Sequence, residues 1–386
     1  MSDKKPNIDR AISYAREIAH PRLVGSEGEG RAARYITGVL KEKGLEVEEE
    51  PFRIKIVPWI PLRIGLISSL IFLLIGFLIS REHKFISAII TTVILISFIF
   101  MGKLWSFLAG LDLLPDLTRG LSSKNIIAGI TKGGERRVFL IAHYDSKGQS
   151  ISLITKILLV ATGSFYLILL TLQYVSGPPH QSQEGINLQL YVPFSFAVII
   201  ILILASVRTD NSSPGGLDNA GSVGILIELA GLLKERPYKG LSITIIFTGA
   251  EELGLLGAYA FLKRHRHELN SDNCYFLNLD GVGVGGRLKQ FGKRPIFQIL
   301  PAFPMVTGLM MDHLPFEKAG FRAMSLGCVS GKTLKIHTKE DNADLLEPEG
   351  IEEAGIKVLE ILDRLDEGSV DPKNIAKKNN ICYIML

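Results

Sequence analysis

The segment RVFLIAHYD, residues 137–145, decides the fold of this chain. After its first residue it is an apolar run rich in β-branched and aromatic side chains, which is typical of a strand buried on both faces of a parallel sheet. The run ends in His143 and Asp145, two residue types that bind metal ions. Because ligands of open α/β sheets bind outside the carboxyl ends of the strands, we expect a functional site where this strand ends.

The same pattern recurs further along the chain. Two more buried strands are predicted at 241–247 and 274–279, and an edge strand with interleaved charges at 45–57. Helices are predicted at 8–43, with a turn at 21–28, at 218–234, from about 253, and at 351–365. Strands that alternate with helices predict an α/β domain with a mostly parallel (mixed) sheet and helices on both of its faces.

Four long apolar stretches interrupt this α/β pattern. Ile64–Ser80 and Phe85–Met101 are each 17 residues without a charge, and Ile157–Val175 and Leu190–Val207 flank a polar turn. About 20 apolar residues are needed to span a bilayer, and flanking residues extend each stretch. We interpret them as two inserted transmembrane helical hairpins, 56–104 and 151–207. The alternative is that some of them are buried core helices.

Each hairpin returns the chain to the side from which it left. The segments 1–55, 105–150 and 208–386, together 280 residues, then share one compartment and suit a single discontinuous domain. Lys and Arg residues near the membrane are concentrated on this side, whereas the hairpin tips carry only Arg81 and Lys84; those on the domain side are Arg53, Lys55, Arg63, Lys103, Lys147, Lys156 and Arg208. This asymmetry predicts a multi-pass membrane protein with its catalytic domain in the cytoplasm. The polar residues 1–16 contain no apolar core of a secretory signal.

Composition excludes several other functions. The net charge is only +4 and no basic face is apparent, so nucleic-acid binding is not expected. The three cysteines, Cys274, Cys328 and Cys382, are far apart and form no C-x-x-C pair. We therefore expect neither a disulfide framework nor a cysteine zinc site, but reduced thiols that are mostly buried.

Metal-binding side chains follow the predicted strands. The first strand ends in His143, the second runs into Glu251 and Glu252, and the third ends in Asp280; Asp218 and His337 follow on later loops. Imidazole and carboxylate are the ligands of zinc, and a catalytic zinc keeps one position open. The histidines, the aspartates and one glutamate are too many ligands for one tetrahedral ion. They suit two zinc ions that share a bridging carboxylate.

The residues also resemble a known family, the co-catalytic zinc aminopeptidases, which include secreted bacterial leucyl aminopeptidases and glutamate carboxypeptidases. The matching motifs occur in the family's order and cover nearly all of the segments outside the hairpins. They are RLVGS (22–26), AHYDS (142–146), PGGLDNA (214–220), TGAEELG (248–254), LD (279–280) and IHT (336–338) with Asp341. The chain departs from the family at Gly221-Ser222, Ile336 and Asn342, none of which is a ligand, and in having the two hairpins.

The resemblance implies a role for each residue. One zinc ion would be held by His143, Asp218 and Asp280, and the other by Asp218, Glu252 and His337, so that Asp218 bridges. Glu251 would be the general base that takes a proton from water, and Asp145 would orient His143 from behind. No other cofactor is implied.

Three functions remain compatible with these residues. We favour an aminopeptidase that is anchored in the lipid bilayer and hydrolyses peptides. The second is a carboxypeptidase or another metal-dependent amide hydrolase, which the ligands do not distinguish because specificity would come from loops such as 301–331. The third is a catalytically inactive membrane scaffold, which the presence of Glu251 and every ligand disfavours. The hairpins can be plain anchors. The alternative follows from the hairpin that leaves just after Asp145 and returns just before Asp218: it would bring the rim of the site close to the bilayer, and the substrates would be hydrophobic or membrane-derived peptides.

Overall fold

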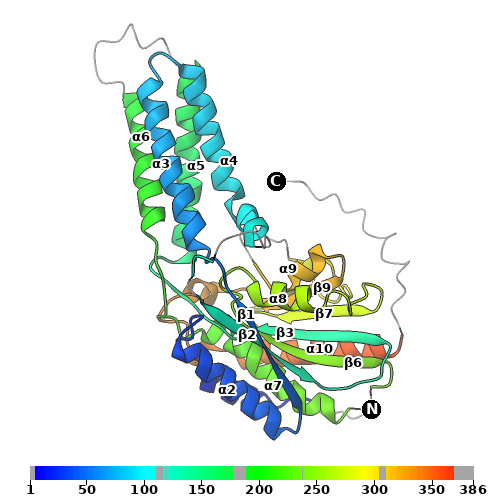
Figure 1. The fold of residues 1–386 in the computed structure, drawn as a ribbon. Helices are drawn as coiled ribbons and strands as arrows, with labels where there is room; N and C mark the ends of the chain where they lie inside the picture. The colour runs from blue at the N-terminus through cyan, green and yellow to red at the C-terminus, as the bar shows by residue number, and fades with distance from the viewer. Residues whose placement is uncertain are drawn as a thin grey trace.

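The structure, a computed structural model, describes residues 5–109, 116–118, 120–176, 188–236, 238–303 and 310–368. These residues form an α/β domain and a bundle of four helices that stands at one end of it (Figure 1). Cys274 and Cys328 are free and buried, as expected. Cys382 lies outside the described residues.

The domain is built on a seven-stranded mixed sheet. The strand order is β1 (Glu46–Arg53), β2 (Ser122–Gly129), β6 (Leu241–Thr248), β3 (Arg136–His143), β7 (Cys274–Leu279), β9 (Arg322–Cys328) and β8 (Leu288–Arg294). The central strands β6, β3, β7 and β9 run parallel, while β1, β2 and β8 pair antiparallel. The predicted mixed sheet is confirmed, and β1 lies at its edge as expected.

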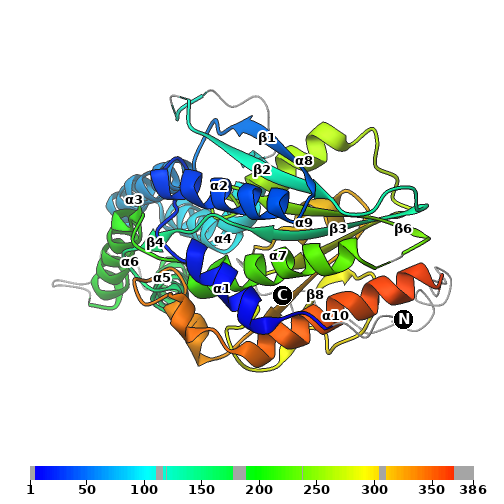
Figure 2. The same ribbon diagram turned by 90° about the horizontal axis from the view of Figure 1, so that it is seen from below.

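Helices cover both faces of the sheet, as the alternation of elements predicts (Figures 1 and 2). One face is covered by α1 (Ile8–Ile18), α2 (Glu27–Glu42), α7 (Gly221–Lys234) and α10 (Pro348–Asp366), and the other by α8 (Leu256–His265) and α9 (His313–Lys318). Aromatic rings fill the second interface: Phe276 of β7 stacks on Phe316 of α9 with ring centroids 3.9 Å apart. The sheet is thus buried on both sides, which explains its continuous apolar strands.

The bundle consists of α3 (Trp59–Ile79), α4 (Lys84–Ala109), α5 (Leu153–Ser176) and α6 (Leu188–Ser206). Among the described residues, four helices are long and apolar enough to cross a membrane: α3, α5, α6 and the segment Gly216–Lys234. That last segment is 83% buried in the domain, whereas the windows of α3, α5 and α6 are only 17%, 17% and 33% buried. This segment, most of which is α7, therefore belongs to the core of the domain. The bundle, completed by α4, presents the apolar surface that fits a bilayer.

Each helical hairpin is closed at its base by an antiparallel strand pair. The first hairpin, α3 and α4, lies between β1 and β2, which pair along their whole length. The second hairpin, α5 and α6, lies between β4 (Gly148–Gln149) and β5 (Thr209–Asp210), which form a short ribbon. The two predicted hairpins are confirmed as elements of the fold. Their domain boundaries stay a prediction.

Three local predictions are wrong. Asp218 does not open a helix: it has an extended backbone, and α7 begins at Gly221. The helix expected from about 253 begins at Leu256, because the chain first turns through positive φ values at Gly254 and Leu255. The region 301–331, expected to be loops, contains α9 and β9. For Asp218 the reason is the hydrogen bonds that Arg22 and Asp341 make with the loop before it, because a single sequence does not display contacts between distant segments.

Candidate metal centre

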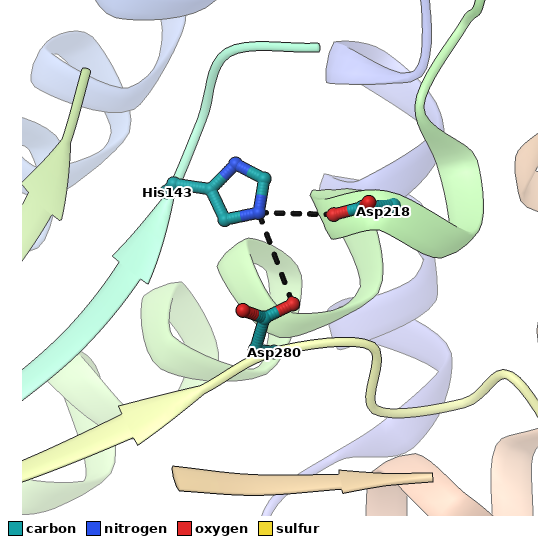
Figure 3. A group of neighbouring side chains, drawn as sticks. All are labelled: His143, Asp218 and Asp280. Atoms are coloured by element: carbon teal, nitrogen blue, oxygen red, sulfur yellow. Dashed lines mark ion pairs between the residues drawn. The ribbon is translucent and has the colours of Figure 1, made fainter. Parts of the chain in front are cut away.

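Three side chains from separate elements converge at the carboxyl end of the sheet. His143 ends β3, Asp280 follows β7, and Asp218 lies on the turn that precedes α7 (Figure 3). The Nε2 atom of His143 is 2.9 Å from Oδ1 of Asp218 and 3.9 Å from Oδ1 of Asp280. The parallel neighbours β3 and β7 thus deliver an imidazole and a carboxylate to one point, as the strand-end argument predicts.

A second group of three shares Asp218 with the first. Nε2 of His337 is 3.2 Å from Oδ2 of Asp218 and 2.9 Å from Oε1 of Glu252, which follows β6. Asp218 therefore presents one carboxylate oxygen to each imidazole. This arrangement is the one that a bridging carboxylate requires.

These donor atoms fit a metal better than they fit one another. Side chains of the two groups are between 1% and 15% exposed. Nevertheless Oδ1 of Asp218, Oε1 of Glu252 and Nε2 of His337 have no partner with hydrogen-bond geometry. Unpaired buried polar atoms are costly unless they bind something. Two imidazoles with three carboxylates are a zinc donor set, and among the described residues only these two groups have their donor atoms within 4.8 Å of one another.

The electrostatics of the protein alone show how these charges are balanced. Burial by itself would lower the pKa of His143, but Glu251, Asp145, Asp218 and Asp280 outweigh it and raise that pKa well above its usual value. Burial opposes ionisation of Glu252 too, but His337 and Lys147 lower the pKa of Glu252 to about 2. Since metal ions bind deprotonated imidazole, cations and protons compete for this site.

Glu251 lies beside both groups and belongs to neither. It is 7% exposed, and burial, together with Glu252, Asp280 and Asp312, raises its pKa well above its usual value. A carboxylate with a raised pKa that is not a ligand can accept and release a proton near neutral pH. Its expected role as the general base is compatible with this position and stays a prediction.

Asp145 supports the centre from behind. Its carboxylate accepts hydrogen bonds from the backbone N–H groups of Glu251 at 3.1 Å and Glu252 at 3.2 Å. Nδ1 of His143 lies 3.2 Å from the Asp145 backbone oxygen and 3.6 Å from its Oδ1. Asp145 thus couples the orientation of the imidazole to the segment that carries both glutamates. The prediction that it orients His143 is consistent with these contacts.

Two charged residues lie at the centre without having been predicted there, Asp312 and Lys147, of which the sequence marks Lys147 only as a basic residue near the membrane. Nζ of Lys147 lies 2.6 Å from Oε2 of Glu252, and it also donates to the Glu252 backbone oxygen. Asp312 is completely buried, accepts a hydrogen bond from Thr248, and has a pKa that burial raises to about 7. Lys147 could have been noticed because it follows the AHYDS motif. No local signal marks Asp312, which lies between β8 and α9.

The RLVGS motif acquires a structural role. Arg22 is fully buried and donates to the backbone oxygen of Tyr144 on one side, and to those of Pro214 and Gly215 on the other. It therefore ties the loop after β3 to the loop before Asp218. A Cβ at Gly215, where φ is +62°, would lie 2.9 Å from Nη1 of Arg22, so the close approach requires glycine.

Asp341 holds the loop before Asp218 from the opposite side. Its Oδ1 accepts from the N–H of Leu217 at 2.6 Å, and its backbone oxygen accepts from Gly216 at 2.9 Å. Asp341 belongs to the loop that carries His337. We call Arg22 and Asp341 the loop clamp, because together they set where Asp218 lies relative to both histidines.

Comparison with known proteins confirms the resemblance that the motifs indicate. Residues 201–362 match the model of peptidase family M28. Aminopeptidase YwaD of Bacillus subtilis is 27% identical over 203 residues, which cover 46% of this chain and 44% of that protein. The vacuolar membrane protease of Candida albicans is 29% identical over 187 residues, covering 44% of this chain and 22% of that protein. The match thus spans less than half of the length of either relative.

Solved structures share the fold. A zinc aminopeptidase from Bacillus subtilis superposes with a TM-score of 0.53 at 15% identity, covering 93% of this chain and 95% of that one. A glutaminyl cyclase from Bacteroides thetaiotaomicron gives 0.53 at 16% identity, covering 93% and 98%. At such identities the likeness shows the fold alone, and proteins with different printed activities share it. The expected zinc-exopeptidase architecture is confirmed.

Proposed function

We propose that this chain is a membrane-anchored peptidase that holds two zinc ions and removes amino-terminal residues from peptides. The observation that carries the proposal is the shared carboxylate of Asp218, which turns one oxygen toward His143 and the other toward His337. The match to peptidase family M28 and the aminopeptidase relative support it.

The donor groups divide between the two ions. His143, Asp218 and Asp280 would hold one, and Asp218, Glu252 and His337 the other. Zinc at such a site supplies an acidified water and polarises the scissile carbonyl. Lys147 fixes the carboxylate of Glu252, and Asp145 fixes the segment that carries Glu251 and Glu252.

Proton transfer falls to Glu251. Its carboxylate would take a proton from the attacking water and deliver it to the leaving amine, as a general base and then a general acid. The buried surroundings raise its pKa, which makes the second step possible at neutral pH.

Substrates in this proposal are peptides with a free amino terminus and a hydrophobic character. We place the α/β domain on the cytoplasmic side, because Lys and Arg residues are concentrated where the bundle joins the domain. The membrane protease relatives are compatible with the bilayer as its location.

The test is release of a fluorophore from amino-acid amides by detergent-purified protein, with Glu251→Gln beside it and metal content measured in both. Hydrolysis by the wild type, about two zinc ions per chain, and a zinc-loaded but silent variant are expected. A pair of peptides, one acetylated at its amino terminus and one amidated at its carboxyl terminus, separates the exopeptidase classes. Cleavage of the acetylated peptide alone would identify a carboxypeptidase, and a wild type unable to hold zinc would favour an inactive scaffold.

A further inference from the structure

The metal centre is tied directly to the foot of the helical bundle. The ribbon of β4 and β5 carries the chain from the AHYDS loop into α5 and back from α6. Within this ribbon, the N–H of Gln149 donates to the backbone oxygen of His337 at 3.0 Å. A residue of the proposed zinc site and the strand that leads into the bundle are therefore in contact.

Little chain separates that contact from the first helix. The helix α5 begins at Leu153, four residues after Gln149. Even fully extended, four residues span only about 14 Å. The first turn of α5 accordingly lies within roughly 2 nm of the His337 backbone, whatever path the connection takes.

Two other helices of the bundle, α6 and α3, also end close to the β4–β5 ribbon. Arg208, two residues beyond the end of α6, exchanges hydrogen bonds with Ser150: its N–H donates to Ser150 Oγ and its oxygen accepts from the Ser150 N–H, each at 3.0 Å. Arg63 of α3 donates to the backbone oxygen of Val207 at 3.1 Å. Three helices thus meet the domain at one junction without an intervening stalk.

Apolar surface extends down to this junction. Ile154, the second residue of α5, is 43% exposed, Leu202 of α6 is 50% exposed, and Ile67 of α3 is 53% exposed. The helix α6 has 19 residues, about 28 Å at 1.5 Å per residue, which is close to the thickness of the hydrocarbon core. A helix of that length spans the bilayer only if its last turn lies at the hydrocarbon boundary. The boundary is therefore at the foot of the bundle, next to the domain.

From this geometry we infer that the substrates are peptides anchored in the same membrane leaflet, by an acyl chain or an apolar segment, with a short spacer between the anchor and the free amino terminus. The inference rests on the proposed peptidase function and names its substrate class. An anchored peptide is confined to the layer in which the site lies, which raises its effective concentration without any new contact. A spacer that is too short cannot reach the site, and one that is very long loses the advantage.

A spacer ladder in liposomes tests this. Full-length protein is reconstituted into liposomes and given peptides with amino-terminal leucine, Gly-Ser spacers of 1 to 40 residues, and a carboxyl-terminal lysine that is either palmitoylated or free. A flexible spacer covers about 5–6 Å times the square root of its length, so a distance of roughly 2 nm corresponds to about 13 residues. We expect kcat/KM for the anchored series to peak between about 6 and 20 residues, at least about tenfold above the free peptide of equal length. Glu251→Gln liposomes measure background hydrolysis.

The outcomes are distinct. An advantage of the anchor that peaks with spacer length and disappears when excess detergent dilutes the surface supports the inference. Equal hydrolysis of anchored and free peptides at every length would overturn it and leave the peptidase function standing. Hydrolysis of neither series by zinc-loaded protein would overturn the peptidase function, and this inference with it.

Discussion

Substitution of Arg22 by methionine tests whether the loop clamp sets the metal centre. Methionine is apolar and replaces the aliphatic part of the arginine side chain, but it leaves the backbone oxygens of Tyr144, Pro214 and Gly215 without the guanidinium. Hydrogen bonds from a charged donor contribute about 1.5–3 kcal/mol each, so the two on the Asp218 side amount to roughly 3–6 kcal/mol before relaxation. Part of this free energy is lost from metal binding, because the clamp positions Asp218, and loss of such supporting contacts typically weakens metal binding by about 10–100-fold.

The assay is a chelator competition that gives the zinc affinity of Arg22→Met and wild type, together with the melting temperature of each with and without zinc. The matched control is Arg16→Met, since Arg16 is 62% exposed and lies 3.9 Å from the nearest carboxylate oxygen of Asp344. We expect the control to match wild type, and the stabilisation by zinc to shrink in Arg22→Met. If Arg22→Met lowers the melting temperature equally with and without zinc and keeps the wild-type affinity, the clamp only supports the fold and the reasoning is wrong.

Three further predictions follow from the centre and the bundle. Lys147→Met should weaken retention of one zinc ion by about tenfold while the other stays, because only Glu252 loses its fixed position; titration of apo protein with cobalt, followed by visible absorption, separates the two sites. Zinc affinity should rise with pH, because the raised pKa of His143 keeps a competing proton on the imidazole. The metal-free protein should show the opposite trend: the stability that protonated His143 contributes is complete below its unfolded pKa of about 6.5 and is lost as pH rises through the raised folded pKa. Melting temperatures of chelator-treated protein across about pH 5.5–8.5 measure this loss. The variant Glu82→Cys, on the first hairpin tip, should react with an impermeant thiol reagent added outside the cell, whereas Lys339→Cys, on the α/β domain, should not. The reverse labelling would refute the placement of the α/β domain in the cytoplasm.

The part of the fold that was predictable is the part governed by strong local patterns. The apolar run before His143 and those before Glu251 and Asp280 read as buried strands, and parallel strands bring their carboxyl ends to one edge. The length of the four apolar stretches likewise predicted both helical hairpins. Hydropathy alone, however, does not separate α7 from the bundle, because both are apolar; only the helix-and-strand context of Gly216–Lys234 places it in the core.

What was not predictable depends on contacts between distant segments. Asp312 lies at the centre because α9 packs on the sheet beside β9, and no sequence pattern near residue 312 predicts this packing. Similarly, the extended backbone of Asp218 is held by Arg22 and Asp341, which are distant in sequence. Arg22 and Asp341 belong to motifs that match the family, but the motifs do not indicate their structural role. Their hydrogen bonds, which run between loops, supply the reason.

The strand pairs that close the hairpins bear on how the protein is made. β1 and β2 lie on either side of the first hairpin, and His143 and Asp218 lie on either side of the second. In a chain that spans the membrane as we propose, pairing of β1 with β2 requires that both ends of the first hairpin lie on one side, and assembly of the metal centre requires the same of the second hairpin. If the second hairpin were left half-inserted, His143 and Asp218 would lie in different compartments, and a half-inserted first hairpin would separate β1 from β2. Under the proposed function, zinc retention by newly made chains would therefore report correct insertion of the second hairpin.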